Sequence, residues 1–162
     1  MNYPAPSFEA KICPPEQLTA RAALLPRPRV FTNGCFDILH RGHATYLAQA
    51  RALGASLIVA LNSDASVRRQ GKGEARPINA LEDRLAVMAA LECVSLVTWF
   101  EADTPLDAIL ACRPEVLVKG GDWPVERIVG AAEVRSWGGT VHSIPFLHQK
   151  STTALLEKIR RL

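Results

Sequence analysis

The stretch RVFTNGCFDILHRGHATYLAQARALGASLIVALN, residues 29–62, decides the fold. It opens with an apolar, β-prone run, turns at Asn33-Gly34, continues as a helical pattern and closes with a second apolar run, SLIVALN. Strands that are apolar throughout are typical of parallel sheets covered by helices on both faces. The stretch therefore predicts two parallel strands joined by a right-handed helical crossover.

The same alternation continues to the end of the chain. Buried-strand patterns occupy residues 29–33, 56–62, 95–100, 115–120 and 140–145. Helical patterns occupy residues 44–53, 81–92, 105–113, 152–162 and a stretch near 125–137. The sequence predicts an α/β fold, a doubly wound five-stranded parallel sheet forming a single domain. Residues 1–28, Pro-rich at both ends with one helical stretch, are expected to form an N-terminal helical appendage that packs on the domain.

The composition excludes several classes of protein. The chain has 162 residues, 48% of them hydrophobic, enough for one domain with a sizeable core. No apolar run is long enough to cross a bilayer, and the N-terminus lacks the pattern of a secretory signal. We therefore expect a cytoplasmic protein without a membrane partner. The net charge of +3 and the aromatic content of 6% disfavour a nucleic-acid partner.

The cysteines Cys13, Cys35, Cys93 and Cys112 have the spacing of neither a zinc motif nor a disulfide framework. Cys93 and Cys112 lie in apolar helical contexts, which predicts small core residues. Cys35 lies in the turn after the first strand. Packing is favoured over a nucleophilic role there, because no base is clearly arranged for it.

Doubly wound sheets bind ligands outside the carboxyl ends of their strands, where the strand order reverses. His40 and His43 follow the first strand, three residues apart and on either side of Gly42. A helix that begins here offers unpaired N–H groups to phosphate, and imidazole adds further donors. The alternative is that one histidine caps the helix and the other is a buried polar group. The whole pattern favours phosphate chemistry, and no suitably spaced third ligand supports zinc.

The segment NGCFDILHRGH, residues 33–43, resembles the signature of the HxGH nucleotidyltransferases. Residues 61–94, EVLVKGGDW at 115–123 and STTALLEKI at 151–159 extend the likeness to the heptose 1-phosphate adenylyltransferase branch. The resemblance implies a Rossmann-like nucleotidyltransferase domain over residues 29–162. It would transfer AMP from ATP to D-glycero-β-D-manno-heptose 1-phosphate, giving ADP-heptose for lipopolysaccharide core. With no sugar-kinase domain in the sequence, the resemblance implies a stand-alone adenylyltransferase.

The resemblance also implies roles for individual residues. His40, His43 and Lys72 would be catalytic, stabilising the transition state around the triphosphate. Nucleotide and phosphate contacts are implied for Thr32, Asn33, Gly34, Cys35, Phe36, Gly42, Lys119, Gly120, Asp122, Ser151, Thr152 and Thr153. Substrate contacts are implied for Asp37, Asn62, Asp64, Arg76 and Trp123. Mg²⁺ bound mainly through ATP oxygens is the expected cofactor, with no metal site made of side chains.

Several of these positions also fit plainer explanations. The two aspartates fit loop caps, Lys72 a solvated surface lysine, and the hydroxyls at 151–153 ordinary helix capping. The loop after the second strand has one residue more than the family pattern, Gly71. Either Lys72 or Arg69 is therefore the cation that reaches substrate.

Two rival functions fit the same fold. One is a cytidylyltransferase of the same superfamily acting on glycerol phosphate or a related alcohol phosphate. The other is a non-catalytic nucleotide-binding module. The expected partners are ATP and a sugar 1-phosphate, and a homodimer fits the commonest oligomeric state.

Overall fold

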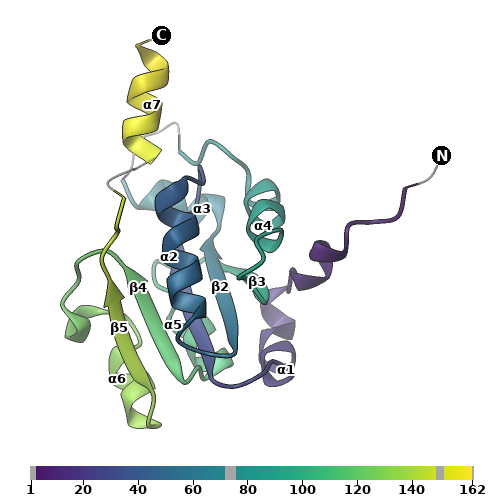
Figure 1. The fold of residues 1–162 in the computed structure, drawn as a ribbon, viewed down its shortest axis with the longest axis vertical. Coiled ribbons are helices and arrows are strands. Elements are labelled where there is room, and N and C mark those ends of the chain that lie inside the picture. The colour runs from purple at the N-terminus through teal and green to yellow at the C-terminus, as the bar shows by residue number, and fades with distance from the viewer. Residues whose placement is uncertain (1–2, 72–75, 149–151, 162) are drawn as a thin grey trace.

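The computed structural model of the chain describes residues 3–71, 76–148 and 152–161, apart from the side chains of residues 153 and 160. Within them, the centre is an all-parallel sheet in the order β3-β2-β1-β4-β5 (Figure 1). The strands are β1 (Arg29–Gly34), β2 (Ser56–Asn62), β3 (Leu96–Phe100), β4 (Val116–Gly120) and β5 (Thr140–Ile144). The predicted five-stranded parallel sheet is confirmed, and each strand begins and ends within one residue of its predicted bounds.

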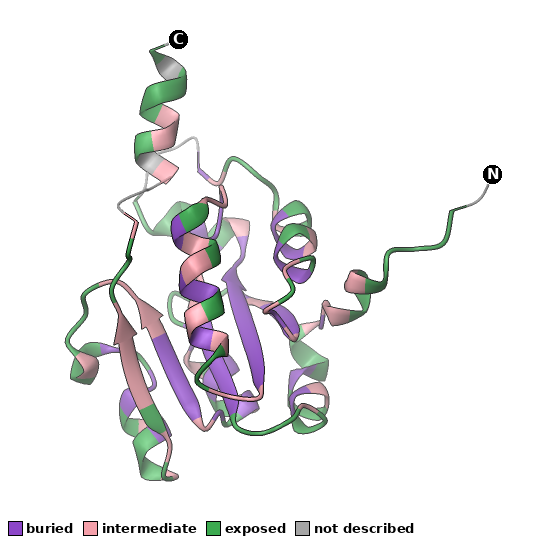
Figure 2. Cartoon of the chain, viewed as in Figure 1, coloured by how far each residue is buried: buried purple, intermediate pink, exposed green. Residues whose placement is uncertain are grey.

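Helices cover both faces of this sheet (Figure 1). They are α1 (Leu18–Ala23), α2 (Arg41–Arg51), α3 (Asp64–Arg69), α4 (Leu81–Ala89), α5 (Leu106–Cys112), α6 (Ala131–Ser136) and α7 (Thr152–Arg160). Helices α2 and α4 share one core cluster with Leu57 and Val59 of β2, whereas α1, α5 and α6 share the other with Ile58 and Ala60. Successive residues of a strand point to opposite faces, so a strand covered on both sides must be apolar throughout, as Figure 2 shows for the central strands.

Two helical predictions differ from the structure. Helix α3 was expected to be loop, because its six residues, DASVRR, are too few and too polar to show a helical apolar period. The helix expected near residues 125–137 is divided into a 3₁₀ turn, η3 (Val125–Arg127), and α6. Gly130 separates them with a left-handed backbone, φ 86°. Adding a Cβ there would also bring it within 2.7 Å of the Ile109 side chain.

Residues 8–25 of the N-terminal segment pack onto the sheet and contribute to its core. The segment forms two 3₁₀ turns, η1 (Ser7–Lys11) and η2 (Pro15–Gln17), followed by α1. Between the turns, Ile12 makes a parallel bridge to Val97 of the edge strand β3. Cys13, Leu18 and Ala22 are buried in the cluster beneath α5 and α6. No disulfide joins the four cysteines, and Cys13 and Cys112 are buried.

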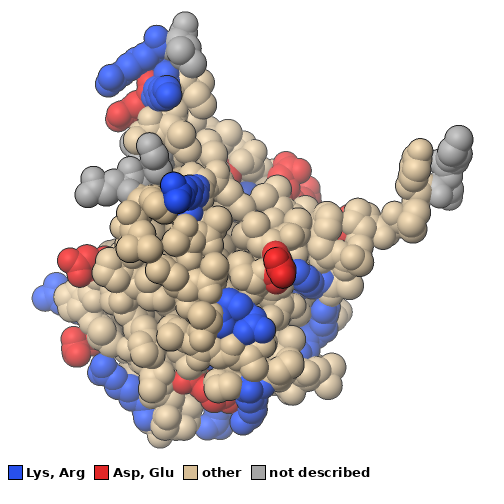
Figure 3. Space-filling model, viewed as in Figure 1, with Lys and Arg blue, Asp and Glu red and all other residues tan. Residues whose placement is uncertain are grey.

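The carboxyl ends of the strands lie at the edge of the sheet from which α2 begins, and α7 lies beyond that edge (Figure 1). Strand β1 is paired with β2 on one side and with β4 on the other, so the strand order reverses between β1 and β4. On the face shown in Figure 3, basic and acidic side chains are interspersed rather than gathered into one patch. Among the described residues, no helix is long and apolar enough to span a membrane.

Candidate active site

His40 and His43 form a stacked pair just beyond the carboxyl end of β1. Their ring centroids are 3.8 Å apart and their planes are inclined by 18°. His40 is the N-cap residue of α2, but its side chain makes no capping hydrogen bond. The ring lies against His43 instead. The structure therefore brings the two rings together, and the capping explanation does not describe the His40 side chain.

Both rings are partly withdrawn from water. Each residue is half-buried, and Nδ1 of each ring has no hydrogen-bond partner among the described residues. Burial lowers the pKa of His40. Burial, and next the neighbouring His40, lower the pKa of His43 to about 4, with the Ile38 backbone opposing the shift. His43 is therefore neutral near pH 7. A buried unpaired polar atom costs about 1–3 kcal/mol and calls for an explanation such as a catalytic role.

Gly42 allows the surrounding backbone to approach the start of α2. A Cβ at this position would lie 3.0 Å from the His40 ring and 3.2 Å from the carbonyl oxygen of His148. On the other side, the Thr152 hydroxyl at the start of α7 donates a hydrogen bond of 3.4 Å to the carbonyl of Ile38. The histidine pair thus lies where the starts of two helices meet, and exposed N–H groups at such positions attract phosphate.

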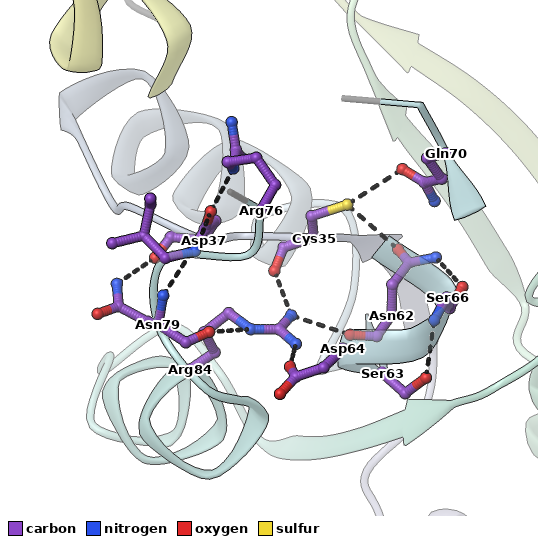
Figure 4. Close-up of polar contacts among 11 residues, drawn as sticks. Cys35, Asp37, Asn62, Ser63, Asp64, Ser66, Gln70, Arg76, Asn79 and Arg84 are labelled. Atoms are coloured by element: carbon purple, nitrogen blue, oxygen red, sulfur yellow. Dashed lines mark hydrogen bonds and ion pairs between the residues drawn. The ribbon is translucent and has the colours of Figure 1, made fainter. Parts of the chain in front are cut away.

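The Asp37 carboxylate holds the RPIN segment, residues 76–79, beside this loop (Figure 4). Asp37 is buried, pairs with Arg76, and accepts hydrogen bonds of 2.9 Å from the backbone N–H groups of Ile78 and Asn79. Burial alone would raise the pKa of Asp37, but the hydrogen bonds from Asn79, Ile78 and Arg76 hold it below its usual value. Asp37 and Arg76, both predicted to contact substrate, therefore neutralise each other and fix a loop.

A buried arginine of α4 ties together the carboxyl ends of β1 and β2 (Figure 4). Arg84 donates to the carbonyl oxygens of Cys35 at 2.7 Å and Asn62 at 2.9 Å. It also donates to the carbonyl of Asn79 at 3.1 Å and pairs with the Asp64 carboxylate at 2.7 Å. Asp64, predicted as a substrate contact, thus serves as an ion-pair partner in this structure.

The side chains of Cys35 and Asn62 meet at the same edge. Cys35 Sγ lies 3.2 Å from Oε1 of Gln70 and 3.7 Å from Oδ1 of Asn62. Asn62 is buried, and its Nδ2 donates to the Ser66 hydroxyl at 3.0 Å. Both residues predicted to contact ligand are therefore bonded within the protein, and they join the ends of β1 and β2 to α3 and to Gln70, which caps its C-terminal end.

The reversal of strand order between β1 and β4 is bridged by a lysine. Lys119 Nζ donates to the carbonyl and side-chain oxygens of Asn33 at 3.4 and 3.3 Å. A cavity of about 180 Å³ opens beside them, walled in part by Trp123, which is exposed. Thr32 is different, since its hydroxyl is bonded to that of Tyr46 in the core. Asn33, Lys119 and Trp123 thus share a cavity, whereas Thr32 is buried against Tyr46.

Other predicted site residues lie elsewhere. Asp122 is exposed in the turn after β4. Lys72, Ser151 and the side chain of Thr153 lie outside the described residues. Arg69, the alternative cation, is paired with Asp103 at 2.8 Å and donates to the carbonyl of Glu101. The contacts of Arg69 therefore run to the loop after β3.

Three residues that sequence reasoning did not assign to the site contribute to it. Tyr46 holds Thr32, Asn79 completes the Asp37 loop, and Phe146 lies edge-on to the rings of His43 and Tyr46. Phe146 follows β5 by two positions, so it belongs to the carboxyl edge that also carries the histidines. That position was the only signal in the sequence that could have found it.

Metal binding by side chains alone is not supported in the described part of the chain. No group of three or more His, Cys, Asp or Glu residues is arranged there to hold an ion. Asp37 and Asp64, the carboxylates that follow β1 and β2, are each paired with an arginine. A divalent cation at this site would accordingly rely on ligand oxygens and water, as Mg²⁺ commonly does with nucleotides.

Comparison with known proteins agrees with this geometry. Residues 31–155 match the family described as cytidylyltransferase-like. The chain is 56% identical over 156 residues to the D-beta-D-heptose 1-phosphate adenylyltransferase of Bordetella bronchiseptica, covering 95% of this chain and 96% of that protein. It is 58% identical over 132 residues to the bifunctional protein HldE of Hahella chejuensis, covering 82% of this chain but only 28% of that protein.

A solved structure agrees as well. The lipopolysaccharide core biosynthesis protein from Thermoplasma volcanium superposes with a TM-score of 0.60 at 27% sequence identity, over 75% of this chain and 98% of that one. The family match over residues 31–155 includes the histidine pair and the turn after β4. The chain belongs to the cytidylyltransferase-like family of nucleotidyltransferases.

Proposed function

We propose that this protein is a heptose 1-phosphate adenylyltransferase. It transfers AMP from ATP to D-glycero-β-D-manno-heptose 1-phosphate and releases pyrophosphate, giving ADP-heptose for lipopolysaccharide core synthesis. The observation that carries the proposal is the stacked pair of His40 and His43, at the start of a helix and at the ligand edge of the sheet. The high identity to a relative named for this activity supports the choice of sugar phosphate and of ATP.

The chemistry asks for positioning more than for proton transfer. An oxygen of the sugar phosphate attacks the α-phosphorus of ATP, the bond from that phosphorus to the bridging oxygen breaks, and pyrophosphate leaves with the electron pair. The nucleophile is already ionised, so no general base is required. Catalysis then rests on donors aimed at the phosphoryl oxygens as their charge grows. The imidazoles of His40 and His43 and the N–H groups at the start of α2 are suited to this role.

Neutral imidazole fits this role as a hydrogen-bond donor. The lowered pKa of His43 keeps one ring nitrogen protonated and the ring uncharged at neutral pH. Lys119 supplies positive charge at the reversal of strand order, and we propose that the cavity beside Asn33 and Trp123 receives part of the nucleotide. Lys72 remains our choice for the loop cation, because Arg69 is engaged with Asp103.

We propose that Mg²⁺ enters with ATP. When bound, it would neutralise phosphate charge and help to orient the triphosphate. The residues around the histidine pair would hold it only indirectly, through the phosphate oxygens that they position. Removing divalent cations with a chelator is expected to abolish turnover, and restoring Mg²⁺ to recover it.

A pyrophosphate-release assay tests the proposal. The purified protein is offered all four nucleoside triphosphates with a panel of sugar 1-phosphates, and the product is identified by mass spectrometry. We expect turnover with ATP and heptose 1-phosphate. The variants His40→Ala and His43→Ala are each expected to lower kcat by about 10²–10³-fold, the usual loss for one preorganised donor. A nucleotide-binding protein that releases no pyrophosphate with any pair would refute the assignment.

The family name supports one rival, a cytidylyltransferase, and the same assay decides between them. Turnover with CTP and an alcohol phosphate, without turnover of ATP, would establish the rival. A cytoplasmic location and a homodimer also remain proposals. Light scattering on the purified protein tests the dimer directly.

A further inference from the structure

Two phenylalanine rings from separate loops enclose the ring of His43. Phe36, in the loop after β1, lies edge-on to it with the centroids 5.2 Å apart and an interplanar angle of 67°. Phe146, in the loop after β5, lies edge-on at 6.5 Å and 80°. His40 stacks on a face of the same ring. Three aromatic neighbours therefore restrict how the His43 side chain can turn.

The loop after β1 is strained in a way that places the first of these rings. Phe36 has a left-handed backbone with φ 45°, a conformation that costs a non-glycine residue about 1–3 kcal/mol and tends to persist at functional sites. Its ring occupies the space that a side chain at residue 34 would take. A Cβ on Gly34 would lie only 2.9 Å from the Phe36 ring. The strain and the glycine together bring an aromatic edge against His43.

Phe146 is placed by a second glycine. A Cβ on Gly120 would lie 2.8 Å from Phe146 Cζ and 3.1 Å from Tyr46 Cζ. Phe146 also meets the Tyr46 ring edge-on, with the centroids 5.6 Å apart. The ring is 42% exposed, so it does not complete the hydrophobic core. It joins the turn after β4 to the helix that carries the histidines.

We propose that Phe36 and Phe146 form an aromatic clamp that positions His43 for phosphoryl transfer. The proposal rests on the function proposed above, but it assigns a role to Phe146 that the family signature does not contain. Edge-on aromatic contacts contribute about 0.5–1.5 kcal/mol each beyond the area that they bury. Two such contacts are enough to select one orientation of a short side chain. Phe36 and Phe146 are positioning residues, since they act through the imidazole.

The clamp also accounts for the charge state of His43. Its enclosure is the main cause of the lowered pKa, and His40 is the nearest titratable group that adds to it. Among the described residues, Tyr46 on the same helix lies against Phe146, and the backbone carbonyl of His148, in the loop after β5, lies near Gly42. Opening the clamp on the Phe146 side would admit water to the ring. The pKa of His43 would then rise toward its ordinary value.

Phe146→Leu tests the clamp, because Phe146 lies outside the core and the variant is expected to fold. Nuclear magnetic resonance titration of the histidine ring protons, with His43→Gln to assign the signal, measures the pKa in the absence of substrate. We expect Phe146→Leu to raise the pKa of His43 by about one unit and to lower kcat about tenfold, with KM for ATP nearly unchanged. Phe146→Tyr keeps the aromatic edge and should restore both values.

Phe8→Leu is the matched control, the same substitution at a half-buried phenylalanine of η1 that packs beneath α4. It should leave the His43 titration and kcat unchanged. An unchanged His43 pKa in Phe146→Leu would overturn the proposal. So would a raised KM for ATP with kcat intact, which would make Phe146 a substrate contact. If the wild-type protein transfers no adenylyl group, the proposed function fails, while the titration still decides the clamp.

Discussion

At the scale of single residues, charge is held in pairs and the reactive groups are kept neutral. Two arginine–aspartate pairs lie around the site, Arg76–Asp37 and Arg84–Asp64, and in each pair the two opposite charges cancel. Burial lowers the pKa of both His40 and His43 and so disfavours their protonation. A triphosphate entering this site would therefore meet oriented, uncharged donors together with the Lys119 ammonium, an arrangement that suits charge growing on phosphoryl oxygens.

Because folding lowers the pKa of His43, the free energy of unfolding depends on pH. The pKa of His43 is lowered to about 4 in the folded protein, so between about pH 6.5 and 4 the unfolded chain binds a proton that the folded protein does not. The stabilisation is complete above the unfolded pKa and is lost as the pH falls. We expect the urea midpoint to fall between about pH 7 and 5, and to fall less in His43→Gln. Equal pH slopes in the two proteins would contradict this account.

His142→Gln serves as the control for that measurement. His142 lies on β5, where its ring nitrogen is 3.0 Å from the Thr140 hydroxyl, outside the stacked pair. The pH slope of this variant should match the wild type. The lowered pKa of Asp37 does not interfere, because its contribution is lost only at lower pH, as the pH falls through its folded pKa.

The sequence predicted that His40 and His43 lie together, because residues spaced three apart on a helical turn face the same side. The stacked rings confirm this. The sequence did not predict the partners of the carboxylates. Asp37 pairs with a residue 39 positions away and Asp64 with one 20 positions away, and local spacing carries no signal for such pairs. Phe146 was not predicted for the same reason, because its contacts run from the loop after β5 to His43 and Tyr46 of α2.

At the scale of elements, a single side chain of α4 links the ends of β1 and β2 to the loop that contains Asn79. Arg84 is buried and donates to three backbone carbonyls as well as to Asp64. We expect Arg84→Met to lower the free energy of unfolding by about 3–5 kcal/mol, since it leaves a carboxylate and several carbonyls without their donor. Urea unfolding monitored by circular dichroism measures the loss.

Arg69→Met is the matched control on the neighbouring helix α3. Its ion pair with Asp103 is exposed, with 49% and 78% of the two side chains accessible, so its loss should cost less than about 1 kcal/mol. Similar losses of unfolding free energy in the two variants would mean that the contacts of Arg84 stabilise the fold no more than an exposed ion pair does. Activity gives a second measure, because only Arg84→Met should disturb the loop after β1.

The elements themselves were predictable where apolar patterning is long. All five strands were predicted within one residue. Burial on both faces demands the apolar runs of β1 to β4, whereas β5, which has no buried residue, was predicted from its place in the alternation of strands and helices. Helix α3 was missed because the Ser63 cap and the polar sequence after it resemble a loop. The division at Gly130 was missed because a glycine within an amphipathic pattern does not reveal its backbone conformation until the packing against Ile109 is known.

At the scale of the whole molecule, the site depends on a sheet whose edge is covered by the N-terminal segment. Residues 1–28 were predicted to be an appendage that packs on the domain, and Cys13, Leu18 and Ala22 of this segment lie in the same cluster as α5 and α6. The backbone N–H of Cys13 donates to the carbonyl of Val97 at 2.8 Å, which continues the sheet at its open edge. The proline-rich composition predicted a segment outside the sheet, but it gave no signal for which of its side chains are buried in the core.

Stepwise truncation distinguishes an appendage from a part of the core. Removing residues 1–6, whose described members are exposed, should leave the urea midpoint unchanged. Removing residues 1–28 takes away a buried leucine and the bridge to β3, and we expect the protein to lose cooperative unfolding. Leu18→Ala in the full chain gives a graded test, with an expected loss of about 2–5 kcal/mol. A wild-type midpoint in Leu18→Ala would show that the buried leucine of this segment does not stabilise the domain.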